Sequence, residues 1–445
     1  MKKALALCGG GSKGSYEMGV WKALKELDEK FDIVCGTSIG ALNAAMICQE
    51  KYDDCLDLWK KTRNNTILKT PISIDESSLK KTFKNMTDLV PFLKNYLKDK
   101  GADISPFKES LEYYIDPDKI LASPMEIGVV CVTFPGFKPH FVNLKEVKKD
   151  LIRQYILASA SCFPLFPVCK IGNTNYIDGG YYDNLPIDFC LDFGAHEVIA
   201  VDLNYNITHK EYLNKPFVRY IHPSWNLGGF FNFTKEAVEK NMTLGYNDAM
   251  KSYKKYLGYR YTFYKEEDIN FISKKFMVVL ANVYKDFKKS RIKSLYKEDI
   301  SLYQILENHT YTSLSYEDYY IRAVEEVMEY LNFDYLKVYR LSELPKLIQK
   351  KFSETNAKSK DLLDNYAKQK TALKKRDYLN KQRPNDILSI CYNIIHHGKI
   401  IEKDLILDIL AINPYLVIYL ILGMVWSDFD AEEEKNFGFT FEFDD

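Results

Sequence analysis

The sequence predicts an α/β fold with a mostly parallel central sheet flanked by helices, followed by a mainly α-helical C-terminal half. Two observations lead to this prediction. Up to about residue 205, short apolar runs of strand length alternate with helical patterns, and strands separated by helices usually pair in parallel. Beyond residue 206, strand signals fade and long stretches rich in Lys, Glu and Tyr take over. We therefore expect two regions, residues 4–205 and residues 206–445.

Each expected element follows from its local pattern. Apolar runs of strand length are found at residues 3–7, 31–35, 125–132 and 198–202. Helical patterns in the first region are found at residues 14–27, 39–49 and 148–159. Helical patterns in the second region are found at residues 234–256, 316–331 and 342–382. No repeat or low-complexity linker separates the two regions, so the boundary near residue 205 depends on the change of composition alone.

Length, charge and cysteine usage restrict the class of protein. A chain of 445 residues can form two or three domains. The 61 basic and 61 acidic residues cancel, which gives no overall attraction to nucleic acid. The nine cysteines are scattered without a Cys-x-x-Cys pair, so we expect no disulfide, no zinc site and a reducing, cytoplasmic environment. We expect no metal and no other cofactor.

A glycine cluster follows the first apolar run. Residues 8–14 read CGGGSKG, directly after the apolar residues 4–7. This apolar run is shorter than the ~7–15 residues of a signal-peptide core, so no signal peptide is expected. The cluster is better interpreted as a turn between a strand and a helix.

Two nucleotide-binding interpretations of this turn fit poorly. A Walker A loop ends in Gly-Lys-Ser/Thr, but here Lys13 is followed by Gly14. The spacing Gly9-x-Gly11-x-x-Gly14 matches a dinucleotide loop, which requires an acidic residue ~20 positions on, at the end of the next strand. Asp32 lies near that distance but precedes the apolar strand residues. What remains is an anion-binding turn at the start of a helix.

A second glycine motif points to a serine nucleophile. Gly36, Ser38 and Gly40 form a G-x-S-x-G between the expected strand at residues 31–35 and the expected helix at residues 39–49. In this context the motif is a nucleophile elbow, a tight turn that needs small residues on both sides of the serine. The Ser38 hydroxyl would lie above the sheet at the positive end of a helix.

The elbow explains the first glycine cluster. A serine that attacks an ester carbonyl creates an oxyanion, which needs preorganised N–H donors from the elbow and from an adjacent loop. Gly9, Gly10 and Gly11 end the neighbouring strand, where their backbone can approach a substrate closely. We therefore predict an oxyanion hole at these three glycines.

The general base is predicted to be an aspartate. None of the seven histidines stands in a context that suggests a triad. Asp178 ends a short β-prone run, and Gly179 and Gly180 open the turn after it. An ordinary Asp-Gly-Gly turn is the alternative interpretation of these residues taken alone.

Together these motifs resemble the patatin-like phospholipase family. The matching segments are the glycine loop at residues 9–14, the elbow at residues 36–40, the Asp-Gly-Gly at residues 178–180 and the stretch ASASCFP at residues 158–164. The resemblance covers roughly residues 4 to 205, and residues 206–445 carry no motif of the family that we recognise. The loop departs from many members of the family at one position, where Cys8 replaces Asp.

The resemblance implies a Ser–Asp dyad that hydrolyses acyl esters of lipids without a histidine. Ser38 would be the nucleophile and Asp178 the base. Gly9, Gly10 and Gly11 would supply oxyanion donors, and Lys13 takes the basic position of the loop. The motif-supporting glycines are Gly14, Gly36, Gly40, Gly179 and Gly180. Apolar Phe163, Leu165 and Phe166 are expected to desolvate Asp178 and raise its pKa.

Two other functions are compatible with the same residues. The enzyme could be a soluble esterase or thioesterase that uses the same dyad. It could also be a gated hydrolase effector, in which the helical half binds a partner or ligand. The expected partner is a lipid or membrane-surface substrate, with no nucleic acid, and the oligomeric state stays open.

Two segments of the second region bear on membrane contact. The apolar run at residues 414–426 is shorter than the ~20 residues that span a bilayer. We interpret it as a buried core helix, with an interfacial anchor as the alternative. The stretch 337–383 is strongly basic, for example at Lys374, Lys375 and Arg376. We expect a solvated helix face there, with anionic membrane contact as the alternative.

Overall fold

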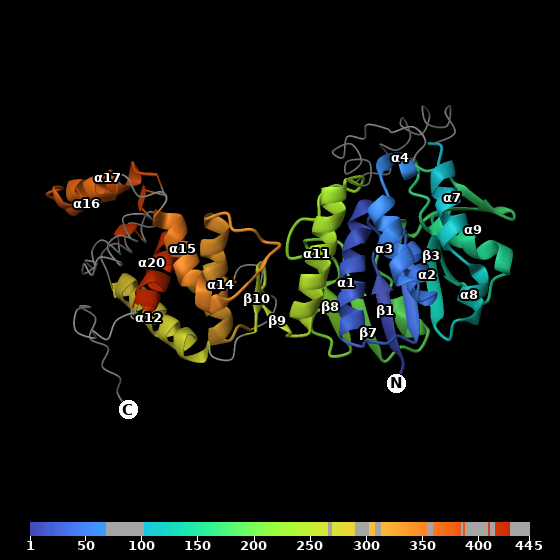
Figure 1. The fold of residues 1–445 in the computed structure, drawn as a ribbon, viewed down its shortest axis with the longest axis horizontal. Coiled ribbons are helices and arrows are strands. Elements are labelled where there is room, and N and C mark those ends of the chain that lie inside the picture. The colour runs from blue at the N-terminus through green and yellow to red at the C-terminus, as the bar shows by residue number, and fades with distance from the viewer. Residues whose placement is uncertain are drawn as a thin grey trace. The chain divides into compact units, whose positions relative to one another are not determined.

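A computed structural model describes most of the chain. The described residues are 1–67, 102–265, 269–289, 302–307, 313–353, 359–383, 386–387, 408–409 and 414–427. The chain forms two compact units, Met1–Lys255 and Tyr256–Asp445, which are drawn in Figure 1.

The first unit is built on one eight-stranded sheet of order β5-β6-β3-β2-β1-β7-β8, with β4 paired to β3. Its strands are β1 Lys3–Leu7, β2 Ile33–Thr37, β3 Glu126–Thr133, β4 Pro139–Asn143, β5 Cys169–Ile171, β6 Thr174–Asp178, β7 Glu197–Val201 and β8 Val218–Ile221. The central strands β3, β2, β1, β7 and β8 run parallel, and β4, β5 and β6 form an antiparallel margin. The expected mostly parallel sheet is confirmed.

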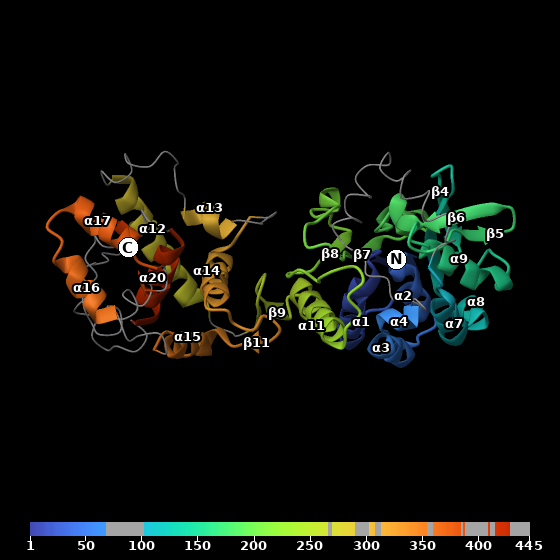
Figure 2. The ribbon, with the colours of Figure 1, turned by 90° about the horizontal axis from the view of Figure 1, so that it is seen from above.

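Helices pack against this sheet and against one another (Figure 2). They are α1 Ser15–Glu26, α2 Ile39–Cys48, α3 Tyr52–Lys61, α4 Asn64–Ile67, α7 Ser105–Tyr114, α8 Pro117–Ala122, α9 Ile152–Ser159, α10 Ile187–Asp192 and α11 Lys235–Ser252. Short 3₁₀ turns are η1 Gly11–Gly14, η3 Lys149–Leu151, η4 Gly179–Tyr181 and η5 Lys210–Tyr212. Helix α2 packs on β1, β2 and β3, α9 on β3, β5 and β6, and α10 on β1, β2 and β7. Every residue of β2 is buried, as expected for a parallel strand covered on both faces.

The first unit extends beyond the boundary near residue 205 that the composition suggested. Strand β8 adds to the sheet beside β7, and α11 packs along α1. The two helices are so close that a Cβ added at Gly19 would lie 1.9 Å from the carbonyl oxygen of Met242. A Cβ added at Gly245 would lie 2.0 Å from that of Tyr16. Residues 206–255 therefore complete the sheet and cover α1, although α11 reads as one more helix of the second region.

The second unit is mainly helical, as expected. Its described helices are α12 Asn270–Lys289, α13 Leu302–Glu307, α14 Tyr316–Tyr330, α15 Leu344–Ser353, α16 Ser359–Ala367, α17 Ala372–Asn380 and α20 Pro414–Ser427, with the 3₁₀ turn η7 Leu341–Glu343. A small sheet joins β9 Tyr256–Leu257, β10 Thr262–Tyr264 and β11 Val338–Tyr339.

The apolar run near the C-terminus forms a core helix in this structure. Helix α20 packs against α12, α13 and α14, and its residues from Leu416 to Leu422 are all buried. None of the helices in the described ranges combines the length and the apolar composition needed to cross a bilayer.

Candidate functional site

The G-x-S-x-G motif folds into a tight turn between β2 and α2. Ser38 has φ +56° and ψ −123° and caps the N-terminus of α2, a strained backbone for a residue with a side chain. A Cβ added at Gly36 would lie 2.2 Å from the carbonyl oxygen of Gly40, and one added at Gly40 would lie 2.5 Å from that of Leu7. Both glycines are therefore required by the turn, and the turn holds the Ser38 side chain at the positive end of α2.

Sheet register brings Asp178 to the same level as Ser38. Thr37 pairs with Val130 of β3, and Asp178 pairs with Cys131, the next residue of the same strand. Strand β3 thus lies between β2 and β6, with Ser38 and Asp178 at matching heights. The Ser38 hydroxyl donates a hydrogen bond to Asp178 Oδ2 at 2.6 Å.

The Asp178 carboxylate has one further donor. The N–H of Gly180 donates to Oδ1 at 2.8 Å. Among the described residues, no histidine is hydrogen-bonded to Ser38 or to Asp178. A Cβ added at Gly179 would lie 2.2 Å from the carbonyl oxygen of Val130, so the glycine lets this turn pack directly against β3.

Burial changes the acidity of Asp178. Asp178 is only 5% exposed, and Ser38 is 6% exposed. Desolvation raises the pKa of Asp178 to about 6, against the opposing effect of the hydrogen bonds from Ser38 and Gly180. The expected apolar surroundings are present, since Phe163 packs on Ile177, the neighbour of Asp178 in β6.

The glycine loop lies against the elbow. A Cβ added at Gly9 would lie 3.1 Å from Ser38 Cβ. The N–H of Gly9 already donates to the carbonyl oxygen of Asn184 at 2.9 Å, which leaves it no free proton for an oxyanion. Within the described ranges, the N–H groups of Gly10 and Gly11 have no acceptor. Lys13 lies in η1, half-buried, and its N–H donates to the carbonyl oxygen of Gly10 at 3.2 Å.

A segment that the sequence analysis assigned to the second region holds the glycine loop. The N–H of Ser12 donates to the carbonyl oxygen of Phe230 at 2.9 Å, and its hydroxyl donates to that of Gly229 at 2.8 Å. Gly11 has φ +57°, and a Cβ there would lie 2.4 Å from the Phe230 oxygen. Residues 229–233 therefore shape the loop beside Ser38, and no local sequence signal marks them.

Two polar side chains near the site were also missed by sequence reasoning. The Asn184 amide donates to the Gly9 carbonyl oxygen at 3.0 Å and to Cys8 Sγ at 3.1 Å. The Ser159 hydroxyl accepts the N–H of Ser38 at 3.0 Å. Ser159 belongs to the stretch ASASCFP that the resemblance singled out without a role, so a signal for it existed. Asn184 has none, because its contacts depend on the folded sheet.

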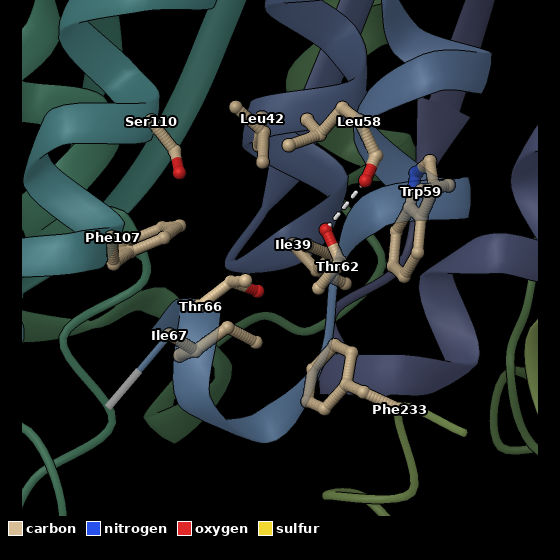
Figure 3. A pocket seen from close by; sticks show the side chains of 10 residues that line it. All are labelled: Ile39, Leu42, Leu58, Trp59, Thr62, Thr66, Ile67, Phe107, Ser110 and Phe233. Atoms are coloured by element: carbon tan, nitrogen blue, oxygen red, sulfur yellow. Dashed lines mark hydrogen bonds between the residues drawn. The ribbon is translucent and has the colours of Figure 1, made fainter. Parts of the chain in front are cut away.

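An apolar pocket adjoins the elbow (Figure 3). Its empty volume is about 410 Å³, including the space open to solvent at its mouth. The lining residues come from α2, α3, α4, α7 and the segment before α11, and they are Ile39, Leu42, Leu58, Trp59, Thr62, Thr66, Ile67, Phe107, Ser110 and Phe233.

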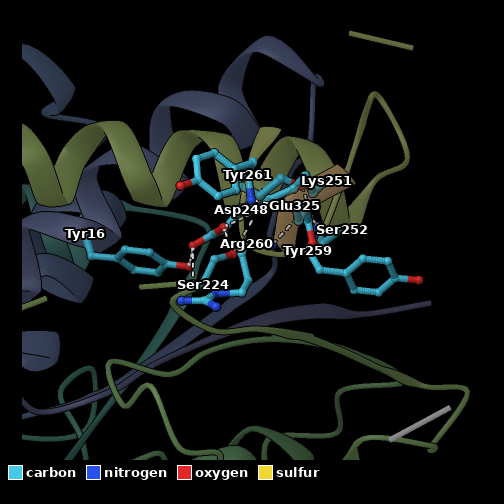
Figure 4. A network of polar contacts seen from close by, with 10 residues as sticks. Tyr16, Ser224, Asp248, Lys251, Ser252, Tyr259, Arg260, Tyr261 and Glu325 are labelled. Atoms are coloured by element: carbon cyan, nitrogen blue, oxygen red, sulfur yellow. Dashed lines mark hydrogen bonds and ion pairs between the residues drawn. The ribbon is translucent and has the colours of Figure 1, made fainter. Parts of the chain in front are cut away.

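A second buried aspartate of the first unit has a different environment (Figure 4). Asp248 of α11 is 5% exposed. Its Oδ2 accepts the Tyr16 hydroxyl at 2.9 Å and the N–H of Ser224 at 3.0 Å. Its Oδ1 accepts the Ser224 hydroxyl and pairs with Lys251 Nζ at 3.0 Å. Both oxygens are thus held by fixed donors that join α1, α11 and the segment after β8.

Comparison with known proteins agrees with the sequence resemblance. Residues 5–191 match the model of the family described as patatin-like phospholipase. "Patatin-like phospholipase domain-containing protein 6" of Homo sapiens is 29% identical over 204 residues, and "Lysophospholipase NTE1" of Mycosarcoma maydis is 26% identical over 203 residues. These matches cover 45% and 46% of this chain but only 13% and 10% of those proteins.

Two solved structures show a weak overall likeness. VipD from Legionella pneumophila aligns with a TM-score of 0.35 and 15% identity, over 99% of this chain and 94% of that one. The type III effector protein ExoU aligns with a TM-score of 0.29 and 16% identity, over 88% and 80% of the two chains.

Proposed function

We propose that the chain, whose residues 5–191 match the patatin-like phospholipase family, is a lipid acyl hydrolase with Ser38 as nucleophile and Asp178 as general base. The observation that carries the proposal is the 2.6 Å hydrogen bond from the Ser38 hydroxyl to Asp178 Oδ2. It joins a strained elbow at a helix N-terminus to a buried carboxylate, which is the geometry of an activated nucleophile.

The reaction proceeds through an acyl-enzyme. As Ser38 Oγ attacks the ester carbonyl carbon, its proton passes to Asp178, and a tetrahedral intermediate forms. Collapse of this intermediate breaks the bond to the alcohol, which takes the proton from Asp178 and departs. The Asp178 carboxylate then takes a proton from water as the water oxygen attacks the acyl-Ser38 ester. Collapse of this second intermediate breaks the bond to Ser38 Oγ, which takes the proton back from Asp178 as the fatty acid is released.

The oxyanion of each intermediate needs donors that are already in place. The N–H groups of Gly10 and Gly11 are the candidates, since they follow Gly9 against Ser38 and have no acceptor within the described residues. The positive end of α2 adds to this stabilisation. Gly9 supports the loop instead, through its hydrogen bond to Asn184.

The raised pKa of Asp178 suits it to act as a base. An ordinary aspartate is a weak proton acceptor near neutral pH, whereas a carboxylate with a pKa of about 6 is ionised at pH 7 and still binds a proton readily. The burial of Asp178 in the sheet margin therefore provides basicity without a histidine.

The names of the relatives favour a lipid substrate over a soluble one. The proteins matched in human and in Mycosarcoma maydis are called a phospholipase domain-containing protein and a lysophospholipase. A soluble esterase or thioesterase would use the same dyad. Gating of the hydrolase by the helical unit, contact of the basic stretch with anionic membranes and a cytoplasmic location all stay predictions.

Replacing Ser38 tests the proposal directly. We expect Ser38→Ala to abolish both the release of fatty acid from phospholipid or lysophospholipid micelles and the labelling by a fluorophosphonate probe. The methyl group fits the space of the hydroxymethyl group, so circular dichroism should show an unchanged fold. Mass spectrometry of the products defines which acyl ester is cleaved. Full activity in Ser38→Ala would refute the proposed nucleophile.

A further inference from the structure

A second cavity of the first unit lies beside α9. Residues of α7, of α9 and of the segment around β5 line it, and α9 packs against both α7 and β5. Its volume is about 330 Å³, which is large enough for a small-molecule ligand. The lining includes neither Ser38, nor Asp178, nor the glycine loop, so this cavity is separate from the proposed catalytic site.

The C-terminal end of α9 lies between the cavity and the dyad. Ser161 lines the cavity, and its carbonyl oxygen accepts the N–H of Asp178 at 2.9 Å. The hydroxyl of Ser159 accepts the N–H of Ser38 at 3.0 Å. A ligand in the cavity would therefore contact the segment that holds both residues of the dyad, without entering the place where an ester is attacked.

The inner part of the cavity is apolar. Ile104 and Leu111 are buried, and Leu157 and Val168 are half-buried. The hydroxyl of Ser161, which is also buried, donates to the carbonyl oxygen of Leu157 at 2.8 Å, so its proton is already used. Hydrocarbon that covers these side chains is removed from water at a gain in free energy.

The mouth of the cavity is basic. Lys108 of α7 and Lys170 of β5 line it and are exposed, and neither has an acidic partner within the described part of the chain. The one carboxylate of the lining, Glu112, pairs through Oε2 with the Arg153 guanidinium group at 3.0 Å. Its charge is therefore compensated, and two positive charges stay available to attract an anion.

The positive charge of Lys108 reaches across the cavity. Cys169, the first residue of β5, also lines the cavity, and burial raises the pKa of its thiol to about 11. The ammonium group of Lys108 opposes this shift, although it belongs to α7. The wall beneath is held in place, since Arg153 Nε donates to the carbonyl oxygen of Ile115 at 2.8 Å. Charge and shape are thus set before a ligand arrives.

We propose that this cavity binds a single-chain amphiphile with an anionic head group. The carboxylate or phosphate of the ligand pairs with Lys108 and Lys170, and its hydrocarbon chain lies against Leu111, Leu157 and Val168. A small inorganic anion would leave the apolar part in water, and an uncharged chain would leave the two ammonium groups unpaired, so only a ligand with both parts uses the whole cavity. The inference does not depend on the hydrolase function, because binding requires neither residue of the dyad.

Binding of short amphiphiles to the full-length chain tests the proposal. Isothermal titration calorimetry compares butyrate, octanoate, monooctyl phosphate and octanol below their critical micelle concentrations. Octanoate should bind about 10²-fold more tightly than butyrate, since each of its four further methylenes contributes about fourfold when buried. Octanol should bind more weakly than octanoate, because it lacks the charge. The tighter of octanoate and monooctyl phosphate identifies the head group as carboxylate or phosphate.

Three variants locate the ligand in this cavity. Lys108→Glu combined with Lys170→Glu should weaken octanoate binding about tenfold, because two attractive charges become repulsive, and should leave octanol binding unchanged. The matched control is Lys215→Glu combined with Lys255→Glu, which changes the net charge equally at exposed positions outside the lining and should change neither affinity. Gln154 is exposed and lines the cavity, so Gln154→Trp fills it and should weaken both ligands.

The outcomes either support the assignment or overturn it. Absence of saturable binding of both octanoate and monooctyl phosphate would overturn it. Equal weakening of octanoate in the two lysine double variants would also overturn it, since the attraction would then come from net charge alone. Unchanged binding in Gln154→Trp would place the ligand elsewhere on the chain. Because every substituted residue is exposed, all variants should fold, which circular dichroism and melting temperatures check.

Discussion

Asp178 and Asp248 are equally buried in the first unit, each 5% exposed, but they are supplied with donors very differently. Asp248 accepts fixed donors on both oxygens, from Tyr16, from Ser224 and from the ammonium group of Lys251. Among the described residues, Asp178 accepts one backbone N–H on Oδ1 and only the Ser38 hydroxyl on Oδ2.

In the proposed mechanism, this difference separates a reactive buried carboxylate from a structural one. A carboxylate with fixed donors on both oxygens, one of them a cation, is stabilised as the anion and joins the elements around it. Burial raises the pKa of a carboxylate with few donors, and such a carboxylate can accept a proton from the hydroxyl beside it. The N–H groups of Gly10 and Gly11 likewise have no acceptor among the described residues, so they would be available to an oxyanion.

Exchanging each aspartate for asparagine gives the largest expected effects. Asp178→Asn should lower kcat about 10²–10⁴-fold, because an amide cannot accept the Ser38 proton. Asp248→Asn should cost about 3–5 kcal/mol of unfolding free energy, because it removes the carboxylate that pairs with the buried Lys251 ammonium group. Ester hydrolysis well below the melting temperature and urea denaturation of both variants measure the two effects.

The contrast between the two aspartates is wrong if loss of kcat and loss of stability do not fall on different variants. Asp178→Asn with normal turnover would remove the base, and Asp248→Asn with a 10²-fold loss of kcat in a folded protein would make Asp248 part of the catalytic machinery. As a further control, substitution of any single histidine should leave substantial turnover if the dyad works without one.

The residues of the proposed catalytic site could largely be identified from the sequence. Gly36, Ser38 and Gly40 form a local motif, since the turn itself demands small residues at fixed spacing. Asp178 is recognisable by the glycines that follow it. The proximity of Ser38 and Asp178 depends on the register of β2, β3 and β6, which the sequence alone does not provide, so there the family resemblance supplied the pairing.

The residues that hold the glycine loop in place could not be predicted, because their contacts join distant parts of the chain. Asn184 and residues 229–233 hold the glycine loop through hydrogen bonds that span about half of the chain. For the same reason, the sequence of α11 does not show that it packs on α1. That contact is evident only in the structure, where Gly19 and Gly245 each face backbone atoms of the other helix. Composition therefore placed the boundary near residue 205, whereas the compact unit ends at Lys255.

The second unit offers a third kind of buried carboxylate, again invisible in the sequence. Glu325 of α14 is 3% exposed, and its Oε1 accepts the N–H groups of Tyr259, Arg260 and Tyr261 at 2.7, 3.0 and 3.0 Å (Figure 4). It fixes the turn between β9 and β10. No glycine or serine motif announces such a structural role, so only the helical character of this unit was predictable.

The role of the glycine loop as a hydrogen-bond donor can be tested with two glycines of nearly equal φ. Gly11 has φ +57° and Gly172 has φ +58°, but only Gly11 is crowded, with the Phe230 oxygen 2.4 Å from an added Cβ. Gly172→Ala should cost about 1–2 kcal/mol of stability, the penalty of the left-handed conformation, with unchanged kcat. Gly11→Ala should cost more and lower kcat about 10²-fold, as for loss of one oxyanion donor.

Kinetics and urea denaturation measured on the same preparations decide the matter. If both glycine variants lose stability but keep the kcat of the wild type, the loop is structural and the oxyanion donors lie elsewhere. If Gly172→Ala also loses 10²-fold in kcat, the effect arises from strain spread through the sheet margin and not from the loop.

The pH dependence gives the smallest and most specific effects. Since Asp178 acts as a base only when ionised, kcat/KM for a soluble ester should be half-maximal at a pH of about 6, the pKa of this carboxyl. It should fall about tenfold for each further unit of acidity. A midpoint near the ordinary aspartate pKa of about 3.9 would show that burial does not tune the base.

The same shift makes a prediction for stability, with an unusual sign. Burial raises the pKa of Asp178 in the folded state from 3.8 to about 6, so between these values the folded chain binds more protons than the unfolded chain. The contribution of Asp178 is therefore fully present below pH 4 and is lost as the pH rises through 6, by about 3 kcal/mol. Asp178→Asn has no such loss. Urea denaturation should show the variant gaining about 3 kcal/mol of stability relative to the wild type between pH 4 and pH 7. A stability difference that does not change with pH would contradict the raised pKa.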